Sequence, residues 1–167
     1  MKDLSLPAKA RGEGRLRGGP LVRRFVPLVM RWRRGMTLGV RGVVLEGETV
    51  LLVRHGYAAG WHFPGGGIEP GETARRALDR ELVEETGIVP TAEPALHGIF
   101  FNRTFGGRDH VAVYLVRDYS RKRVPPPSRE IAEHGFFPLA ALPQGTTGPT
   151  RRRLAEILDG APLDELW

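Results

Sequence analysis

Three glutamates are spaced so that one helix can bring their carboxylates together. Glu81, Glu84 and Glu85 stand at i, i+3 and i+4, which places them on one side of a helix within an arc of roughly 100°. Two carboxylates about 7 Å apart repel by about 2 kcal/mol at an effective dielectric constant of about 20. Such a cluster favours raised pKa values or bound cations, and the hard divalent cations Mg²⁺ and Mn²⁺ suit its oxygen ligands. Taken alone, the same spacing is also typical of a solvated acidic surface, so the flanking residues must decide.

The helix that would carry these acids has a signal at each end. Thr73 can cap a helix that begins at Ala74, and Gly87 can end it in the left-handed conformation. Ala74, Leu78 and Leu82 form an apolar stripe beside the acids. This pattern predicts that the stripe packs on a sheet while the acids face a cavity.

A glycine-rich turn precedes the helix and can bring backbone atoms close to a ligand. Residues 65–67 are all glycine, and Pro70 and Gly71 force a turn just before the helix. Glu72 and Arg80 lie eight residues apart, so they meet only if Glu72 folds back from that turn.

Together these residues form a known signature. Gly66, five residues, Glu72, seven residues and then residues 80–88, RELVEETGI, match every fixed position of the Nudix box. The chain therefore resembles the Nudix hydrolases. That resemblance implies an α/β (α+β) fold, a Nudix-type α/β/α sandwich with a mixed β-sheet, and an enzyme that hydrolyses phosphoanhydride bonds.

The resemblance also assigns roles to residues at the matching positions. Arg80 orients a carboxylate, and the general base is either Glu81 or a glutamate from a later loop, for which Glu130 is the first candidate and Glu133 the second. Mg²⁺ is the expected cofactor, with Mn²⁺ as a substitute. The implied metal ligands are Glu81, Glu84, Glu85 and the carbonyl of Gly65.

Three further residues are candidates for substrate binding: Arg54, His62 and Phe101. A lone histidine is more often a packing or hydrogen-bonding residue, and an aromatic side chain on a strand more often belongs to the core. These structural roles stay open beside the functional ones.

The expected reaction is the hydrolysis of a pyrophosphate bond in a nucleoside triphosphate or in a nucleoside diphosphate linked to another group. Two alternatives stay open, namely RNA 5′-end pyrophosphohydrolysis and a non-catalytic nucleotide-binding module. Substrate markers of several Nudix subfamilies are missing: Arg103 and Thr104 stand where ADP-ribose hydrolases have proline, and Gly67 stands where triphosphatases often have lysine. The leaving group is therefore left open.

Composition describes one globular domain with an extension. The chain has 167 residues, of which 41% are hydrophobic and 26% charged, and it has no cysteine, which excludes disulfides and thiol nucleophiles. No uninterrupted apolar run is long enough for a membrane span, and the N-terminus lacks a signal-peptide pattern, so a cytoplasmic location is expected.

Positive charge is concentrated near the N-terminus. Ten of the 25 Lys and Arg residues lie in the first 35 positions, together with only Asp3 and Glu13. We therefore divide the chain into a basic N-terminal extension, 1–35, and a Nudix domain, 36–160. Residues 20–34 mix arginines with apolar residues, and three roles stay open for them: packing on the domain, contact with RNA, or contact with an anionic membrane. A small nucleotide is the expected partner of the domain, and a homodimer is a further alternative.

Outside the box the sequence predicts strands and one more helix. Residues 150–158 predict an amphipathic helix that buries Leu154, Ile157 and Leu158, and residues 119–128 predict an extended basic loop. The predicted strands are residues 36–45, 49–54, 95–104, 110–116 and 135–139.

Overall fold

The computed structural model describes residues 35–104, 107–122 and 131–167. Contacts divide the chain into Met1–Gly35 and Met36–Trp167, and the fold described below is that of the second unit. The predictions for the basic segment 20–34 and for Glu130 lie outside the described residues. No helix in the described ranges is long and apolar enough to cross a membrane.

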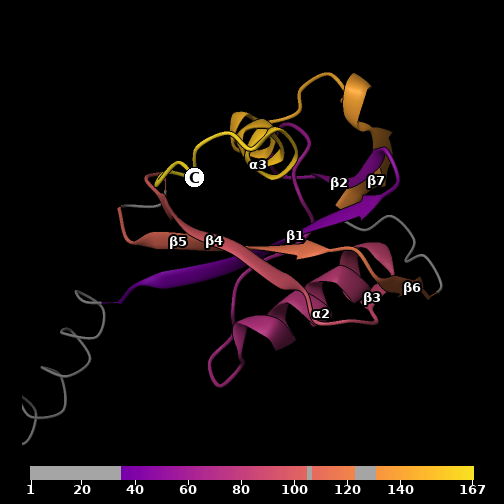
Figure 1. The fold of residues 1–167 in the computed structure, drawn as a ribbon. Coiled ribbons are helices and arrows are strands. Elements are labelled where there is room, and N and C mark those ends of the chain that lie inside the picture. The colour runs from indigo at the N-terminus through magenta and orange to yellow at the C-terminus, as the bar shows by residue number, and fades with distance from the viewer. Residues whose placement is uncertain (1–34, 105–106, 123–130) are drawn as a thin grey trace, which may run out of the picture. The chain divides into compact units, whose positions relative to one another are not determined.

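A five-stranded mixed sheet forms the centre of the domain (Figure 1). Its order is β4-β5-β1-β2-β7, in which β1 and β5 are parallel and the other neighbours are antiparallel. A short turn at Gly47 joins β1 to β2, as predicted. The strands are β1 (Thr37–Glu46), β2 (Thr49–His55), β4 (Ala95–Asn102), β5 (Asp109–Val116) and β7 (Ile131–Pro138).

One helix covers each face of the sheet, α2 (Ala74–Thr86) on one side and α3 (Gly148–Asp159) on the other (Figure 1). Successive residues of a strand point to opposite faces, so β1 contributes to two separate cores. Val40 and Val44 pack with Leu82 of α2, whereas Val43 packs with Leu154 of α3. The predicted α/β/α sandwich with a mixed sheet is confirmed.

A second, two-stranded sheet was not predicted. It pairs β3 (Ile88–Pro90) with β6 (Tyr119–Arg121). The residues of β6 lie in the predicted loop 119–128. The Lys122 N–H donates to the Gly87 carbonyl at 2.8 Å, so β6 also secures the end of α2. A one-turn 3-10 helix, η1 (Leu139–Ala141), follows β7.

The final helix forms as predicted, although one of its three predicted buried residues is exposed. Leu154 is 4% exposed, but Leu158 is 43% exposed, because it lies in the last turn before Gly160 ends the helix. The prediction that Leu158 is buried is therefore wrong.

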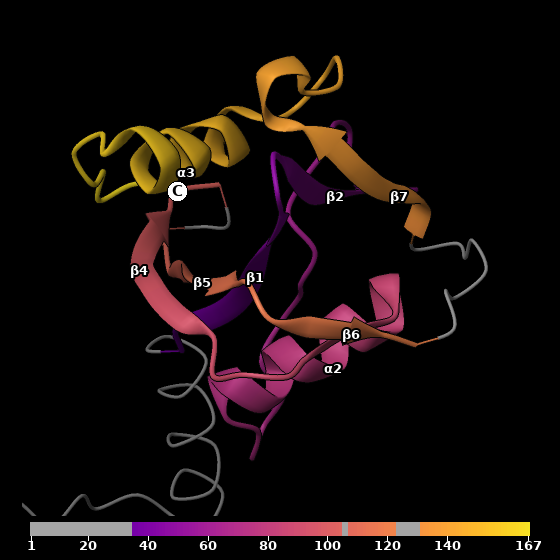
Figure 2. The same ribbon diagram turned by 45° about the vertical axis from the view of Figure 1, so that its right-hand side comes forward.

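Residues 160–167 continue past α3 and meet β4 near its end, at Phe101 (Figure 2). The Phe101 N–H donates to the Glu165 carbonyl at 2.9 Å, and the Trp167 N–H donates to the Phe101 carbonyl at 2.9 Å. These two bonds pair an otherwise open sheet edge with the chain's own C-terminal segment.

Candidate active site

The three clustered glutamates lie on α2, whose ends are fixed by the residues predicted to cap it. Thr73 Oγ1 accepts a hydrogen bond from the Arg76 N–H at 3.2 Å. Gly87 takes a left-handed φ of 71°, and its N–H donates to the Val83 carbonyl at 3.0 Å. Leu78 is fully buried against the sheet, so the acids project from the other sides of the helix.

The segment that leads into α2 pairs with β1 and so carries the glycine-rich turn to the helix. The Val40 N–H donates to the Gly66 carbonyl at 2.8 Å, and the Gly42 N–H donates to the Pro64 carbonyl at 2.9 Å. Between these bonds Gly65 takes a φ of 134°, and a Cβ atom there would lie 2.2 Å from the Val40 carbonyl oxygen. Only glycine fits at position 65, where the glycine-rich turn crosses β1.

Arg80 organises the acids around it. Its Nε and Nη2 atoms donate to the two carboxylate oxygens of Glu72, both at 3.0 Å, so the fold-back of Glu72 is confirmed. Its Nη1 donates to Glu81 at 2.7 Å and lies 3.5 Å from Glu84. Nη2 also donates to the Gly67 carbonyl at 3.1 Å, which ties the glycine-rich turn to the helix.

Glu85 is the most deeply buried of the three acids, with 6% of its side chain exposed, compared with 14% for Glu81 and 60% for Glu84. Its Oε2 accepts a hydrogen bond from the Gly65 N–H at 2.7 Å. The His55 Nδ1 lies 3.9 Å from its other oxygen. Sequence reasoning considered the Gly65 carbonyl and missed the amide, because no residue pattern marks a backbone donor.

Glu81 lies against the glycine-rich turn. A Cβ atom at Gly66 would lie 2.3 Å from Glu81 Oε1, so the carboxylate occupies the space that a side chain would fill. Burial raises the pKa of Glu81 above its usual value, while the hydrogen bond from Arg80 opposes that rise. A carboxylate of this kind accepts a proton more readily than an exposed one.

The chemistry of these donors fits a hard divalent cation, because all of them are carboxylate or carbonyl oxygens. Among the described residues, however, no group of three or more His, Cys, Asp or Glu side chains is gathered closely enough to hold a metal ion. Instead, Arg80 donates to Glu81, and the Gly65 amide donates to Glu85. Metal ligation by Glu81, Glu84, Glu85 and the Gly65 carbonyl stays a prediction.

Of the three predicted substrate-binding residues, His62 lies beside His55, which is close to Glu85. Its ring centroid is 5.7 Å from that of His55, which in turn stacks on Tyr57 at 5.1 Å. Its Nε2 lies 3.1 Å from the Ala59 carbonyl oxygen. Burial lowers the pKa of His62, so its ring is neutral at physiological pH and can donate one hydrogen bond and accept another.

The other two candidates have structural partners. Arg54 forms an exposed ion pair with Glu133 of β7 at 2.7 Å and lies over the Trp61 ring, 5.6 Å from its centroid. Phe101 lies on β4 beside the C-terminal segment, and its ring centroid is 5.3 Å from that of His110. Substrate contact by either residue stays a prediction.

Arg41 is a charged residue near the acids that sequence reasoning missed. It lies partly buried on β1, and a Cβ atom at Gly65 would be 3.0 Å from its Cα. Glu85 and Glu81 both interact electrostatically with its guanidinium. In the sequence it is one polar residue within an apolar strand, and only the crossing of β1 by the glycine-rich turn brings it to the acids.

Comparison with known proteins identifies this arrangement. A model of the NUDIX domain family matches residues 36–158. The chain belongs to that family. The resemblance inferred from the box is therefore confirmed, and the match extends well beyond the box to most of the sheet and both helices. Enzymes of this family generally need divalent metal ions.

Three curated relatives differ in the activity that their names give. The matched stretches span only about a quarter to a half of the length of these relatives. The putative mutator protein MutT4 of Mycobacterium tuberculosis (strain CDC 1551 / Oshkosh) is 38% identical over 102 residues, which are 59% of this chain and 41% of the relative. The RNA pyrophosphohydrolase of Coxiella burnetii (strain RSA 493 / Nine Mile phase I) is 47% identical over 60 residues, 35% of this chain and 26% of the relative. The putative 8-oxo-dGTP diphosphatase of Bacillus subtilis (strain 168) is 37% identical over 76 residues, 45% of this chain and 50% of the relative.

Solved structures share the fold. The MutT NUDIX hydrolase from Burkholderia pseudomallei superposes with a TM-score of 0.64 at 28% identity, covering 72% of this chain and 97% of that one. A NUDIX hydrolase from Nitrosomonas europaea gives a TM-score of 0.62 at 24% identity, covering 79% of this chain and 96% of that one. The second likeness, at this low identity, concerns the fold alone.

Proposed function

We propose that this domain is a Mg²⁺-dependent pyrophosphohydrolase. Its substrate is a nucleoside triphosphate, or a nucleoside diphosphate linked to another group. The observation that carries the proposal is the arrangement around Arg80, which fixes Glu81 and Glu72 beside the glycine-rich turn. A surface acidic patch would not need this scaffold, since solvent alone would satisfy its carboxylates.

The chain's own residues account for positioning and proton transfer. Water adds to one phosphorus of the diphosphate, the bridging P–O bond breaks, and the second phosphate leaves with the bridging oxygen. Glu81, whose pKa burial raises, takes the proton of the attacking water. Arg80 holds the Glu81 carboxylate in place at 2.7 Å, and Glu130 stays the alternative base.

The oxygen donors of the same residues suit a divalent cation. Glu81, Glu84, Glu85 and the Gly65 carbonyl would hold Mg²⁺, with Mn²⁺ as a substitute. When bound, the cation supplies charge neutralisation at the phosphate oxygens and makes water a better nucleophile. The excess of carboxylates over cations in this cluster is what gives it affinity for a metal ion.

The test is a substrate panel with and without Mg²⁺. Nucleoside triphosphates, nucleoside diphosphate sugars and dinucleoside polyphosphates are incubated with the purified chain, and the products are identified by chromatography. We expect turnover that requires a divalent cation and that gives a nucleoside monophosphate or inorganic phosphate or pyrophosphate as a product. Tight nucleotide binding without any product would favour the non-catalytic module instead.

A single variant tests the residue assignment. Glu85→Gln keeps the shape and the contact with the Gly65 N–H but removes the charge. We expect kcat/KM to fall by about 10²-fold or more. Glu93→Gln is the matched control, since Glu93 is 83% exposed and pairs with Arg75 outside the cluster. Full Mg²⁺-dependent turnover by Glu85→Gln would remove this assignment.

RNA with a 5′ triphosphate is a second candidate substrate, and one observation favours it. The Coxiella relative at 47% identity over 60 residues is named an RNA pyrophosphohydrolase. The basic first 35 residues would add affinity for a polyanion through counterion release. If RNA is the substrate, a triphosphorylated oligonucleotide is hydrolysed faster than free nucleotides, and its binding weakens steeply as salt rises. Equal rates for both, independent of salt, would count against RNA.

A further inference from the structure

Arg41 is placed by the register of β1. Its neighbours Val40 and Gly42 face α2, since Val40 belongs to the core under that helix and a Cβ atom at Gly42 would lie 3.0 Å from Leu82. Side chains alternate along a strand, so Arg41 points to the opposite face of the sheet. Gly65, whose N–H holds Glu85, crosses β1 at this position.

The guanidinium of Arg41 lies among several acids. Its electrostatic partners are, in decreasing order, Glu85, Tyr57, Glu81 and Asp109. Burial lowers the pKa of Arg41, and these groups oppose that change, so the side chain stays cationic. A permanent positive charge therefore lies beside the carboxylates that the proposed function assigns to the metal.

None of these carboxylates is bound to Arg41. Glu85 accepts from the Gly65 N–H at 2.7 Å, and Glu81 accepts from Arg80 at 2.7 Å. Asp109 accepts from Thr37 and Asn102 at 2.7 and 2.8 Å. Within the described part of the chain, Arg41 forms no ion pair with any carboxylate.

Arg41 is also short of hydrogen-bond partners. Its Nη1 atom is buried from solvent and has no partner among the residues that the structure describes. Arg80, on α2, differs in that its Nε, Nη1 and Nη2 atoms all donate. A buried charged donor without an acceptor is costly, which indicates that an acceptor from outside the chain belongs there.

We propose that Arg41 binds a phosphate group of the substrate. This inference rests on the proposed function and deepens it. A guanidinium is a planar fork that donates two parallel hydrogen bonds to phosphate oxygens. With one phosphate of the substrate at the box carboxylates and the neighbouring phosphate at Arg41, the site selects ligands that carry at least two linked phosphates.

A purely structural role for Arg41 makes a different prediction. A counter-ion for Glu85 and Glu81 would hold those carboxylates in place, and its loss would disturb metal binding. If Arg41 instead serves to bind phosphate, its positive charge beside the same carboxylates only weakens metal binding. Nucleotide affinity and Mg²⁺ affinity therefore separate the two roles.

The experiment measures binding in the full chain by isothermal titration calorimetry. The probe is the methylene-bridged, non-hydrolysable analogue of ADP in the presence of Mg²⁺, and Mg²⁺ alone is titrated in parallel. We expect R41Q to weaken analogue binding by about tenfold to a hundredfold, the loss typical of a charge-assisted hydrogen bond. Mg²⁺ binding in R41Q should be unchanged or tighter. R41K should lose less, because lysine keeps the charge but lacks the fork.

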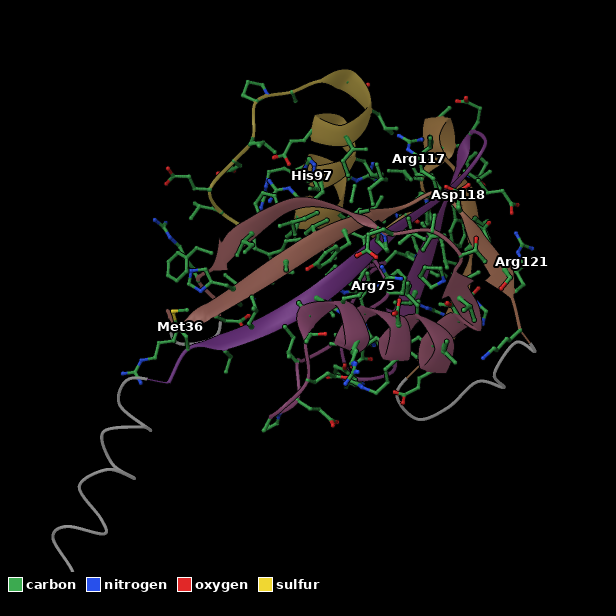
Figure 3. All side chains as sticks on the ribbon, turned by 60° about the horizontal axis from the view of Figure 1, so that its bottom comes forward. Met36, Arg75, His97, Arg117, Asp118 and Arg121 are labelled. Carbon is green, nitrogen blue, oxygen red and sulfur yellow. The ribbon has the colours of Figure 1, made fainter. Side chains whose placement is uncertain are left out.

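Arg117→Gln is the matched control, with the same change of charge at a position just beyond β5 (Figure 3). Arg117 lines a surface depression with Glu46 and Tyr119 that contains none of the box glutamates, so analogue affinity should stay within about twofold. Thermal melting followed by circular dichroism shows that each variant folds. Should R41Q fail to fold, R41K decides the question.

Three results would overturn the inference. R41Q or R41K could bind the analogue as tightly as the wild type, or R41Q could lose Mg²⁺ affinity together with nucleotide affinity. AMP and the ADP analogue could also bind equally well to the wild type. Failure of the proposed function looks different, since the wild-type chain would then hydrolyse no member of the substrate panel with Mg²⁺.

Discussion

Two clusters in this domain pair arginine with glutamate, and they differ in their charge balance. In the box cluster a single guanidinium, that of Arg80, serves Glu72, Glu81 and Glu84. Glu84 is 60% exposed, so the cluster opens to solvent. Carboxylates outnumber cations there, and the excess negative charge is available to a ligand.

The second cluster lies under the C-terminal segment and is closed. Arg153 is fully buried, lies 3.7 Å from the centre of the Phe100 ring and donates to Glu156. Glu156 also lies 2.9 Å from the Nε2 atom of His97, which reaches it from β4 (Figure 3). The Asp164 N–H donates to Glu156 at 3.0 Å, which fastens the C-terminal segment to α3.

The contrast teaches how the two kinds of site can be told apart. Where opposite charges pair and solvent is excluded, as at Arg153 and Glu156, the cluster stabilises the fold. Where acids exceed bases and one of them has a raised pKa, as at Glu81, the cluster has the properties that the proposed function requires. The two clusters should therefore respond in opposite ways to the loss of a carboxylate.

The largest effect is expected from Glu81→Gln. Removal of this carboxylate abolishes its proposed role as base and metal ligand, and kcat/KM should fall by about 10²-fold to 10⁴-fold. Stability should not fall, because the glutamine no longer carries a charge that is mostly buried. Steady-state kinetics and urea unfolding measure the two quantities. A variant with near-normal kcat/KM would place the base elsewhere, with Glu130 the next candidate.

The second effect in size is expected at the closed cluster. Glu156→Ala leaves Arg153 buried without its carboxylate partner, so the free energy of unfolding should drop by about 3–5 kcal/mol. Activity per folded molecule should stay the same. Asp159→Ala, an exposed change at the end of the same helix, is the control and should stay within about 0.5 kcal/mol. Loss of activity at unchanged stability would reverse the roles of the two clusters.

A smaller effect is expected when the support of Arg80 is removed. Glu72→Gln breaks the two-bond contact that holds the Arg80 guanidinium, and Arg80 in turn positions Glu81. We expect kcat/KM to fall by about tenfold to a hundredfold. Glu69→Gln in the same turn is the control, as the Glu69 side chain is exposed. Equal kinetics for the two variants would mean that Arg80 holds Glu81 without help.

The smallest effect concerns pH. Burial alone raises the pKa of Glu156, but hydrogen bonds from the Asp164 N–H and His97, together with Arg153, outweigh burial and hold the pKa below its usual 4.5. A lowered folded pKa stabilises the fold above the unfolded pKa, and this contribution is lost as pH falls through the folded pKa. The free energy of unfolding should therefore decline below about pH 4.5, and Glu156→Gln should flatten that decline. If the free energy of unfolding fell equally with pH in the wild type and in Glu156→Gln, the lowered pKa of Glu156 would be contradicted.

Local signals predicted the elements best. Thr73 and Gly87 bound the box helix, and both cap α2 in the structure. The bounds of β2 differ by one residue from the prediction, because an apolar run between turn residues needs only local information. The resemblance of the box then supplied the layered fold around these elements.

Pairing between strands that are distant in the chain could not be predicted from the sequence. The strand β6 forms only because Tyr119 and Arg121 meet β3, some thirty residues earlier, and nothing within residues 119–121 favours a strand over the predicted loop. Arg41 and Arg153 were missed for the same reason. Arginine is usually exposed, and only distant residues such as Gly65 and Phe100 create the surroundings that bury these two.

The backbone bonds between Phe101 and residues 165–167 have a practical consequence. They satisfy main-chain groups on a flank of the sheet that would otherwise recruit a strand from another molecule. Proteolytic trimming before Glu165 would bare that flank and favour self-association in concentrated samples. A flexible spacer should therefore separate an affinity tag from Trp167, so that residues 165–167 keep their hydrogen bonds to β4.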